Sequence, residues 1–144
     1  MFAKQLTVFI ENRTGRLAEV LGVLKESKVN ILSMSLADTT EFGLLRLIVD
    51  DASLGTKKLS ENGFSALLSD VFIICIPHKP GSLQSLLDII DDHGISIEYM
   101  YGLSLESDSA YVVLKTSDAA RVDEIFSAKG VKTLTCEELA KTDI

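Results

Sequence analysis

Residues 9–17 read FIENRTGRL and residues 75–83 read CIPHKPGSL, and these two segments decide the fold. When the second segment is laid over the first, Gly81 falls on Gly15 and the apolar positions that follow keep the same spacing. The agreement continues over about 60 residues with a single added residue, which indicates an internal repeat. The chain therefore contains two copies of one structural unit.

Each copy shows the same succession of apolar patterns. Apolar residues alternate with polar ones where a strand is expected, and they recur every three or four residues where a helix is expected. Residues 71–76 are apolar on both faces, which predicts a central strand covered on both sides. The first copy is expected to have strands at 5–11, beginning at 29, at 44–49 and at 64–70. Its first helix follows a turn at 12–15, and its second helix lies at 52–61. The second copy is expected to have strands at 71–76, beginning at 95, at 110–115 and at 131–135, a first helix after a turn at 78–81 and a second helix at 118–128.

The order strand, helix, strand, strand, helix, strand is the ferredoxin-like βαββαβ arrangement, so the predicted class is α+β. Each unit is expected to have a four-stranded antiparallel sheet with two helices on one face. We assign residues 1–69 to the first domain and residues 70–144 to the second. The sequence leaves open whether the two copies form one eight-stranded arrangement or two facing sheets.

The composition argues against several kinds of partner. The 144 residues carry a formal net charge of −7, and Lys and Arg do not cluster as binding to nucleic acid or to a membrane surface requires. Residues 1–12 hold only a short apolar run, which fits neither a signal peptide nor a membrane span, so we expect a cytoplasmic protein. Cys75 and Cys136 lie far apart and lack a metal-ligand spacing, and we expect no metal and no cofactor.

A ferredoxin-like arrangement hosts many functions, so the loops must indicate which one is present. The first loops read NRTG at 12–15 and HKPG at 78–81, without the Cys-x-x-Cys of a metal chaperone. The middle strands read LLRLIV at 44–49 and AYVVLK at 110–115, with Tyr111 as the one aromatic residue, whereas an RNA-recognition surface needs several stacking aromatics. No set of His, Cys and carboxylate residues suggests catalysis, so we expect that the protein is not an enzyme.

The segments ENRTGRLAEVLGVLKESKVNI at 11–31 and IPHKPGSLQSLLDIIDDHGISI at 76–97 resemble the ACT domain, a small-molecule regulatory module of amino-acid metabolism. The segments SLADTTEFGLLRLIVDD at 35–51 and IEYMYGLSLESDSAYVV at 97–113 resemble a narrower group, the stand-alone tandem ACT proteins of bacteria. The resemblance implies a homodimeric amino-acid sensor without a catalytic domain, whose state a partner enzyme reads. The alternative is a non-catalytic regulatory subunit of an amino-acid-metabolism enzyme that acts through a protein–protein interface.

The first loop has a composition suited to an amino-acid ligand. Gly15 allows the backbone to approach a ligand closely, and the amides of Arg16 and Leu17 at the helix start can hold a carboxylate. Asn12 and Asn30, expected to come together where the first strand ends and the second begins, offer acceptors for an ammonium group. These are also ordinary turn and helix-start residues, so a purely structural role stays open.

The second copy differs at both asparagine positions. His78 stands where Asn12 does, and Ser96 stands where Asn30 does. In serine-sensing ACT domains the pattern resembles His-x-Asn followed by a later Asn. This chain keeps both asparagines, as Asn12 and Asn30, but has Ile10 in place of the histidine, so the identity of the ligand stays open.

The resemblance also implies that Asp38, Thr39 or Thr40 of one unit faces the loop of the other, because ligands of ACT pairs usually lie between two domains. The full set of candidate ligand-binding residues is Asn12, Arg13, Gly15, Arg16, Leu17, Asn30, Ile31, Asp38, His78, Gly81, Ser82, Leu83 and Ser96.

Overall fold

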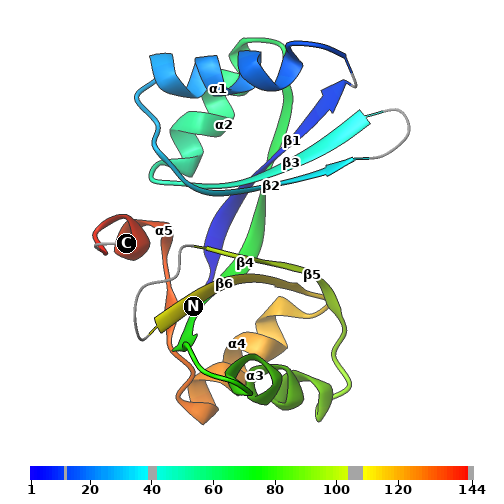
Figure 1. The fold of residues 1–144 in the computed structure, drawn as a ribbon, viewed down its shortest axis with the longest axis vertical. Helices are drawn as coiled ribbons and strands as arrows, with labels where there is room; N and C mark the ends of the chain where they lie inside the picture. The colour runs from blue at the N-terminus through cyan, green and yellow to red at the C-terminus, as the bar shows by residue number, and fades with distance from the viewer. Residues whose placement is uncertain (12, 39–41, 104–108, 143–144) are drawn as a thin grey trace.

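The computed structural model describes residues 1–11, 13–38, 42–103 and 109–142 (Figure 1). Its elements follow the order expected for two βαββαβ copies, with one short helix added at the end. They are β1 (Ala3–Glu11), α1 (Arg16–Glu26), β2 (Ile31–Asp38), β3 (Phe42–Val49), α2 (Ala52–Glu61), β4 (Ser65–Pro77), α3 (Ser82–Asp91), β5 (Ile97–Gly102), β6 (Ser109–Thr116), α4 (Ala119–Lys129), β7 (Thr133–Leu134) and α5 (Cys136–Ala140).

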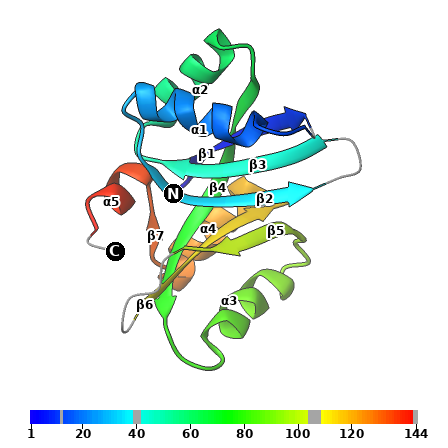
Figure 2. The ribbon, with the colours of Figure 1, turned by 45° about the horizontal axis from the view of Figure 1, so that its top comes forward.

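The described strands form two antiparallel layers that share β4. The first layer has the order β2-β3-β1-β4, and the second has the order β7-β4-β6-β5. Helices α1 and α2 cover the outer face of the first layer, α3 and α4 cover the outer face of the second, and the strands lie between them (Figures 1 and 2). The predicted α+β fold is confirmed. Of the two arrangements left open, the chain combines features of both, because the strands form one seven-stranded sheet through β4 and its two halves pack face to face through residues such as Ile48 and Val113.

Strand β4 belongs to both units. Sequence analysis separates it into strands at 64–70 and 71–76, but the structure has one uninterrupted strand. Its residues up to Val71 pair with β1, and its residues from Phe72 onward pair with β6. Ser69 and Asp70 stand between the two apolar runs, but neither Gly nor Pro is present there, and both residues continue the ladder with β1 as the partners of Gln5 and Lys4. The domain boundary proposed between residues 69 and 70 falls inside this strand.

The second half of β4 is covered on both sides, as its sequence predicts. Val71, Phe72, Ile73 and Ile74 are all fully buried. Phe72 and Ile74 pack in the core under α3 and α4, whereas Val71 and Ile73 pack in the layer between the two sheets. The apolar run therefore serves two cores at once.

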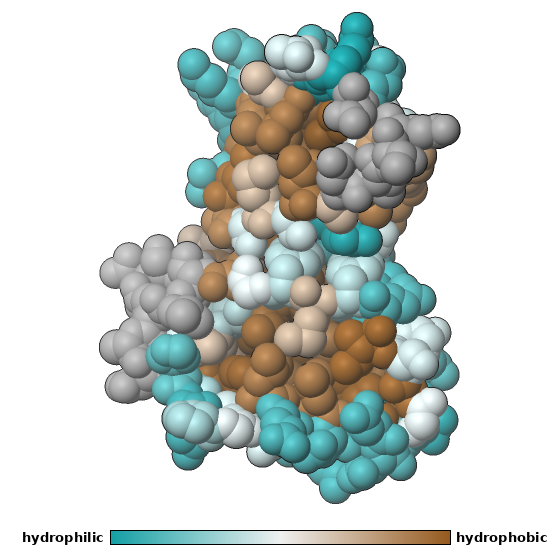
Figure 3. Space-filling view, turned by 45° about the vertical axis from the view of Figure 1, so that its right-hand side comes forward, coloured by the Kyte–Doolittle hydropathy of each residue, from teal (hydrophilic) through white to brown (hydrophobic). Residues whose placement is uncertain are grey.

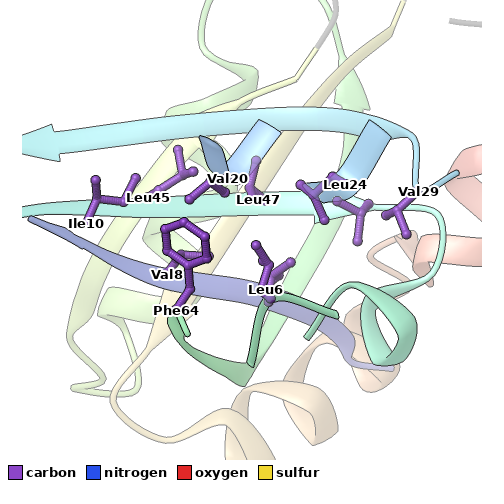
Figure 4. Close-up of a cluster of buried hydrophobic side chains, with 11 residues drawn as sticks. Leu6, Val8, Ile10, Val20, Leu24, Val29, Leu45, Leu47 and Phe64 are labelled. Atoms are coloured by element: carbon purple, nitrogen blue, oxygen red, sulfur yellow. The ribbon is translucent and has the colours of Figure 1, made fainter. Parts of the chain in front are cut away.

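The core of the first unit lies between its sheet and its two helices (Figure 4). Val20 and Leu24, one helical turn apart on α1, are fully buried, and Leu59 of α2 is buried beside them. They pack against Leu6 and Val8 of the central strand β1. The apolar stripe of α1 that defines the repeat is therefore the stripe that anchors this helix.

The short helix α5 was absent from the sequence-based expectation. Thr135 and Glu138 form a reciprocal capping box at its start, with the Thr135 side chain accepting from the Glu138 amide. Leu139 is fully buried in the layer between the sheets, in a cluster that includes Ile48 of β3. The end of the second unit is thus packed against the first unit.

One polar cluster interrupts the apolar layer between the sheets. Gln5 of β1 is fully buried. Its Nε2 donates to Oγ1 of Thr7 at 3.1 Å and to the hydroxyl of Tyr99 at 2.7 Å, and its Oε1 accepts from the hydroxyl of Tyr101 at 2.7 Å. The Arg46 guanidinium lies 3.7 Å from the centre of the Tyr99 ring. One side chain of the first unit therefore holds two tyrosines of the second.

The position of Tyr101 predicts a loss of stability in alkaline solution. Burial, together with the neighbouring Tyr99, raises the pKa of the Tyr101 phenol well above its ordinary value of 10.0. The unfolded chain then loses this proton at a lower pH than the folded chain, so the free energy of unfolding should be unaffected below pH 10 and should fall above it. Urea titrations across this range should show the decline, and Tyr101→Phe should make it shallower. An identical decline in the variant would contradict the assignment.

Candidate functional site

The two loops that open α1 and α3 have the same backbone geometry. Gly15 has φ 89° and ψ −11°, and Gly81 has φ 85° and ψ −11°, both in the left-handed region that favours glycine. The carbonyl of Gly15 accepts from the Glu19 amide at 3.0 Å, and the carbonyl of Gly81 accepts from the Ser85 amide at 3.0 Å. The loop motif recognised in the sequence is therefore duplicated in the structure.

These two helices begin differently from the others in the described part of the chain. Asp51 caps α2, Asp118 caps α4 and Thr135 caps α5, each through a side-chain oxygen that accepts from a first-turn amide. Glycine stands at the cap of α1 and of α3 and provides no such oxygen. Because first-turn amides need acceptors, the starts of α1 and α3 remain available to an anion.

The open donors can be named. Among the described residues, the amides of Leu17 and Ala18 in α1, and of Leu83 and Gln84 in α3, have no hydrogen-bond acceptor. The Arg16 amide, expected to be open as well, donates weakly to the Arg13 carbonyl at 3.4 Å. The open amides of α1 thus begin one residue later than the sequence suggests.

The two arginines of the first loop are engaged within their own unit. Arg13 is exposed, and its Nε lies 3.2 Å from a carboxylate oxygen of Glu11. The Arg16 side chain is only 13% exposed, because its guanidinium lies 4.2 Å from the centre of the Phe64 ring and donates to Glu19 at 2.6 Å. Arg16 therefore fills the space beside the start of α1.

The strand ends that were expected to bring Asn12 and Asn30 together, the end of β1 and the start of β2, lie apart. Asn12 itself lies outside the described residues. Its neighbour Glu11 pairs with Phe42 at one end of β3, whereas Ile31, next to Asn30, pairs with Val49 at the other end of β3. Both β1 and β2 run antiparallel to β3, so they run parallel to each other. The end of one and the start of the other must therefore lie at opposite edges.

Asn30 instead joins β2 to the end of β3. Its amide donates to Oδ1 of Asp50 at 2.9 Å, and its carbonyl accepts from the Asp50 amide at 3.1 Å. Ser96 makes the corresponding pair with Ser117 in the second unit. His78 is exposed in the second loop, at the edge opposite to Ser96. Asn30 and Ser96 therefore lie in two equivalent connections, at the strand ends opposite to the starts of α1 and α3.

Other candidate residues fall into two groups. Leu17, Ile31 and Leu83 are half-buried and pack on the cores of their own units. The backbone of Asp38 ends β2 opposite Gly43, at the edge that holds the first loop of the same unit. The neighbouring Thr39 and Thr40 lie outside the described residues.

Ser82 of the second loop borders a shallow hollow of about 290 Å³. The hollow lies between the end of β4, the first turns of α3 and the connection from α4 to β7. The Ser82 hydroxyl oxygen is buried and has no hydrogen-bond partner among the described atoms. The lining residues are Cys75, Ile76, Pro77, Ser82, Ser85, Leu86, Ile89, Gly130, Val131 and Lys132.

Two larger hollows are lined mainly by negatively charged side chains. One, of about 470 Å³, is lined by Asp50, Asp51 and Glu137 with Lys4. The other, of about 670 Å³, lies between α1 and α2. It is lined by Glu19, Glu26 and Glu61 with Lys58. Carboxylates outnumber ammonium groups in both, so neither is suited to a ligand that carries a carboxylate.

Comparison with known proteins identifies the family of the chain. A family model described as an ACT domain pair matches residues 1–142. The chain belongs to the ACT domain pairs. Protein BT0572 from Bacteroides thetaiotaomicron is similar to this ACT pair at 37% sequence identity, with 99% of this chain and 98% of that chain covered and a TM-score of 0.92. No curated protein matches significantly in sequence.

More distant structures share the fold of this ACT pair. The regulatory subunit of aspartate kinase from Thermus thermophilus is 17% identical, with 88% and 90% of the two chains covered and a TM-score of 0.64. The regulatory subunit of aspartate kinase from Thermus flavus is 16% identical, with 87% and 88% covered and a TM-score of 0.57. At these identities the likeness extends to the fold. No described helix of the ACT pair is both long and apolar enough to span a membrane.

Proposed function

We propose that this ACT pair is a non-catalytic regulatory protein that binds an amino acid. The observation that carries the proposal is the duplicated helix start, at which a left-handed glycine leaves first-turn amides without an acceptor among the residues that the structure describes. Such amides, with the positive end of the helix dipole behind them, are suited to the carboxylate that all amino acids share.

The facing layers give binding a way to be read by a partner. A ligand shifts a conformational equilibrium only if it binds one state better than the other. Both loops lie at ends of strands that belong to the shared double layer, so a ligand at either loop can favour one packing of the layers. A partner enzyme that contacts the surface would then respond to that packing.

A thermal-shift screen against the twenty amino acids at millimolar concentration tests the proposal. A ligand present at about 100 times its dissociation constant adds about 2.7 kcal/mol to the free energy of unfolding. For a chain of this size, the midpoint of thermal unfolding should rise by about 5–10 °C. One or a few responders are expected, and glycerol or sodium chloride at the same concentration should leave the midpoint unchanged. A panel without any responder would refute amino-acid binding.

An interface on the sheet edges supports the second candidate, a regulatory subunit that works by contact alone. Met34 and Leu36 on edge strand β2 are 41% and 51% exposed, and Met100 on edge strand β5 is 37% exposed. Figure 3 shows hydrophobic surface in the upper and lower halves of one face, with a paler band between them. Exposed apolar edges are suited to a second protein surface, including a second copy of this chain. If no amino acid in the panel raises the midpoint of thermal unfolding, this candidate is favoured.

A further inference from the structure

We propose that the two units are unequal, and that the hollow beside α3 holds a small aliphatic carboxylate while its counterpart beside α1 is closed. The proposal rests on the proposed function, because it names the unit and the ligand class for that activity. It is argued from the residues that the repeat places at the same positions.

The first unit has large side chains where the second has small ones. The repeat places Ser82 on Arg16, Ser85 on Glu19 and, after the single added residue, Val131 on Phe64. In the first unit the Arg16 guanidinium lies over the Phe64 ring and bonds to Glu19, so the Arg16 side chain occupies the space at the helix start. The hollow of about 670 Å³ that Glu19 and Phe64 also line lies between α1 and α2 and has a surplus of carboxylates.

In the second unit the same space is open. Serine and valine are too short to cross it, and the hollow of about 290 Å³ remains. Small-molecule sites typically begin near 300 Å³, so this volume suits a compact ligand of amino-acid size.

The walls of the hollow indicate the chemistry of the ligand. Leu86 is nearly fully buried, and Ile76, Ile89 and Val131 are half-buried, so together they offer an apolar surface to an aliphatic group. Lys132 is the one charged residue among the described lining residues, and it is exposed at the rim. An apolar wall beside an unopposed cation is complementary to an aliphatic chain that ends in a carboxylate.

The first turn of α3 adds donors next to the hollow, which Ser82 lines. Ser82 is the first residue of α3, and the next two amides, of Leu83 and Gln84, have no acceptor among the described residues. The Ser82 hydroxyl is a buried donor without a partner in the described part of the chain, which is costly unless something accepts from it. A carboxylate bound near the start of α3 would lie within the field of these donors and of Lys132. Branched aliphatic amino acids and their 2-oxo acids share this chemistry.

The two cysteines provide a direct test on the unaltered protein. Cys75 lines the hollow, and Cys136 lines the separate 470 Å³ hollow, so the second thiol is an internal control. Iodoacetamide labelling of each cysteine is followed by mass spectrometry with and without valine, leucine, isoleucine or their 2-oxo acids. At saturation, an effective compound should slow labelling of Cys75 by about fivefold or more and leave Cys136 unchanged. The two compound classes in the panel separate an amino acid from a 2-oxo acid as the source of the carboxylate.

A paired variant tests the comparison between the units. Ser82→Arg combined with Val131→Phe places in the second unit the residue types that fill the first. The double variant should bind the effective compound about tenfold or more weakly and should lose the protection of Cys75. Ser60→Arg, an exposed serine on α2, is the matched control and should leave both unchanged. The midpoint of thermal unfolding without ligand verifies that each variant is folded. If the pair fails to fold, Cys75 protection in the unaltered protein decides.

The outcomes separate this inference from the proposed function. If an amino acid raises the midpoint of thermal unfolding but leaves Cys75 labelling unchanged, the hollow is not the site, while amino-acid binding stands. If only acidic or basic amino acids respond, the aliphatic assignment is overturned. If no compound alters either the midpoint or the labelling, the proposed function fails together with this inference.

Discussion

Replacing Gln5 by alanine should lower the free energy of unfolding by about 3 kcal/mol, because the change removes the hydrogen-bond partner of two tyrosines. Gln5 is fully buried between the sheets, and its amide bonds to the hydroxyls of Tyr99 and Tyr101 at 2.7 Å each. Without it, the hydroxyls of two half-buried tyrosines lose this partner, and a buried unsatisfied group costs about 1–3 kcal/mol. Urea unfolding at neutral pH measures the change.

The chain offers a matched control for this prediction. Gln84 is exposed on α3, and Gln84→Ala should change the free energy of unfolding by less than about 0.5 kcal/mol. Combining Gln5→Ala with Tyr101→Phe removes one of the stranded hydroxyls, so the double variant should be more stable than the sum of the two single changes predicts. Strict additivity would mean that the hydroxyl finds another partner, and the cluster would then not couple the two units.

Replacing Phe72 by alanine should cost about 4 kcal/mol, the largest effect expected of a single substitution in this protein. The Phe72 ring is fully buried, 5.2 Å from the Phe126 ring and 5.3 Å from the Phe2 ring, measured between centroids. Its loss leaves a cavity and removes an edge-to-face contact with Phe126. Small domains have a free energy of unfolding of about 5–15 kcal/mol, so a loss of about 4 kcal/mol is a large fraction of the total and should lower the urea midpoint markedly.

Phe42→Ala is the control for the Phe72 variant. Phe42 is 41% exposed, so its truncation should cost about 1 kcal/mol or less. Urea unfolding followed by circular dichroism compares the two variants. A loss below about 1.5 kcal/mol for Phe72→Ala would mean that the core under α3 and α4 collapses around the gap.

The sequence predicted most of the fold because the apolar pattern is strong at the positions that matter. The stripe containing Val20 and Leu24 identified α1, and the doubly apolar run at 71–74 identified the buried half of β4. Helix α5 was missed because it is short, although Thr135 and Glu138 have the spacing of a capping box and could have revealed it.

The candidate site was harder to predict, for two physical reasons. The loops were found because a left-handed glycine marks both of them, but Asn12 and Asn30 were grouped by their order along the chain. The parallel course of β1 and β2, which the predicted fold already implies, separates their surroundings. The packing of Arg16 on Phe64 had no signal in the sequence, because an arginine at a helix start is usually exposed.

The shared strand has a consequence for how this protein changes over generations. Two domains joined by a flexible linker can be lost, gained or exchanged by recombination at the linker, and each can then evolve in a separate gene. β4 offers no such junction, because it is one uninterrupted strand that pairs with β1 up to Val71 and with β6 from Phe72 onward. The two copies are therefore inherited together, and one of them can give up a role, as the filled space beside Arg16 suggests, while the other retains it.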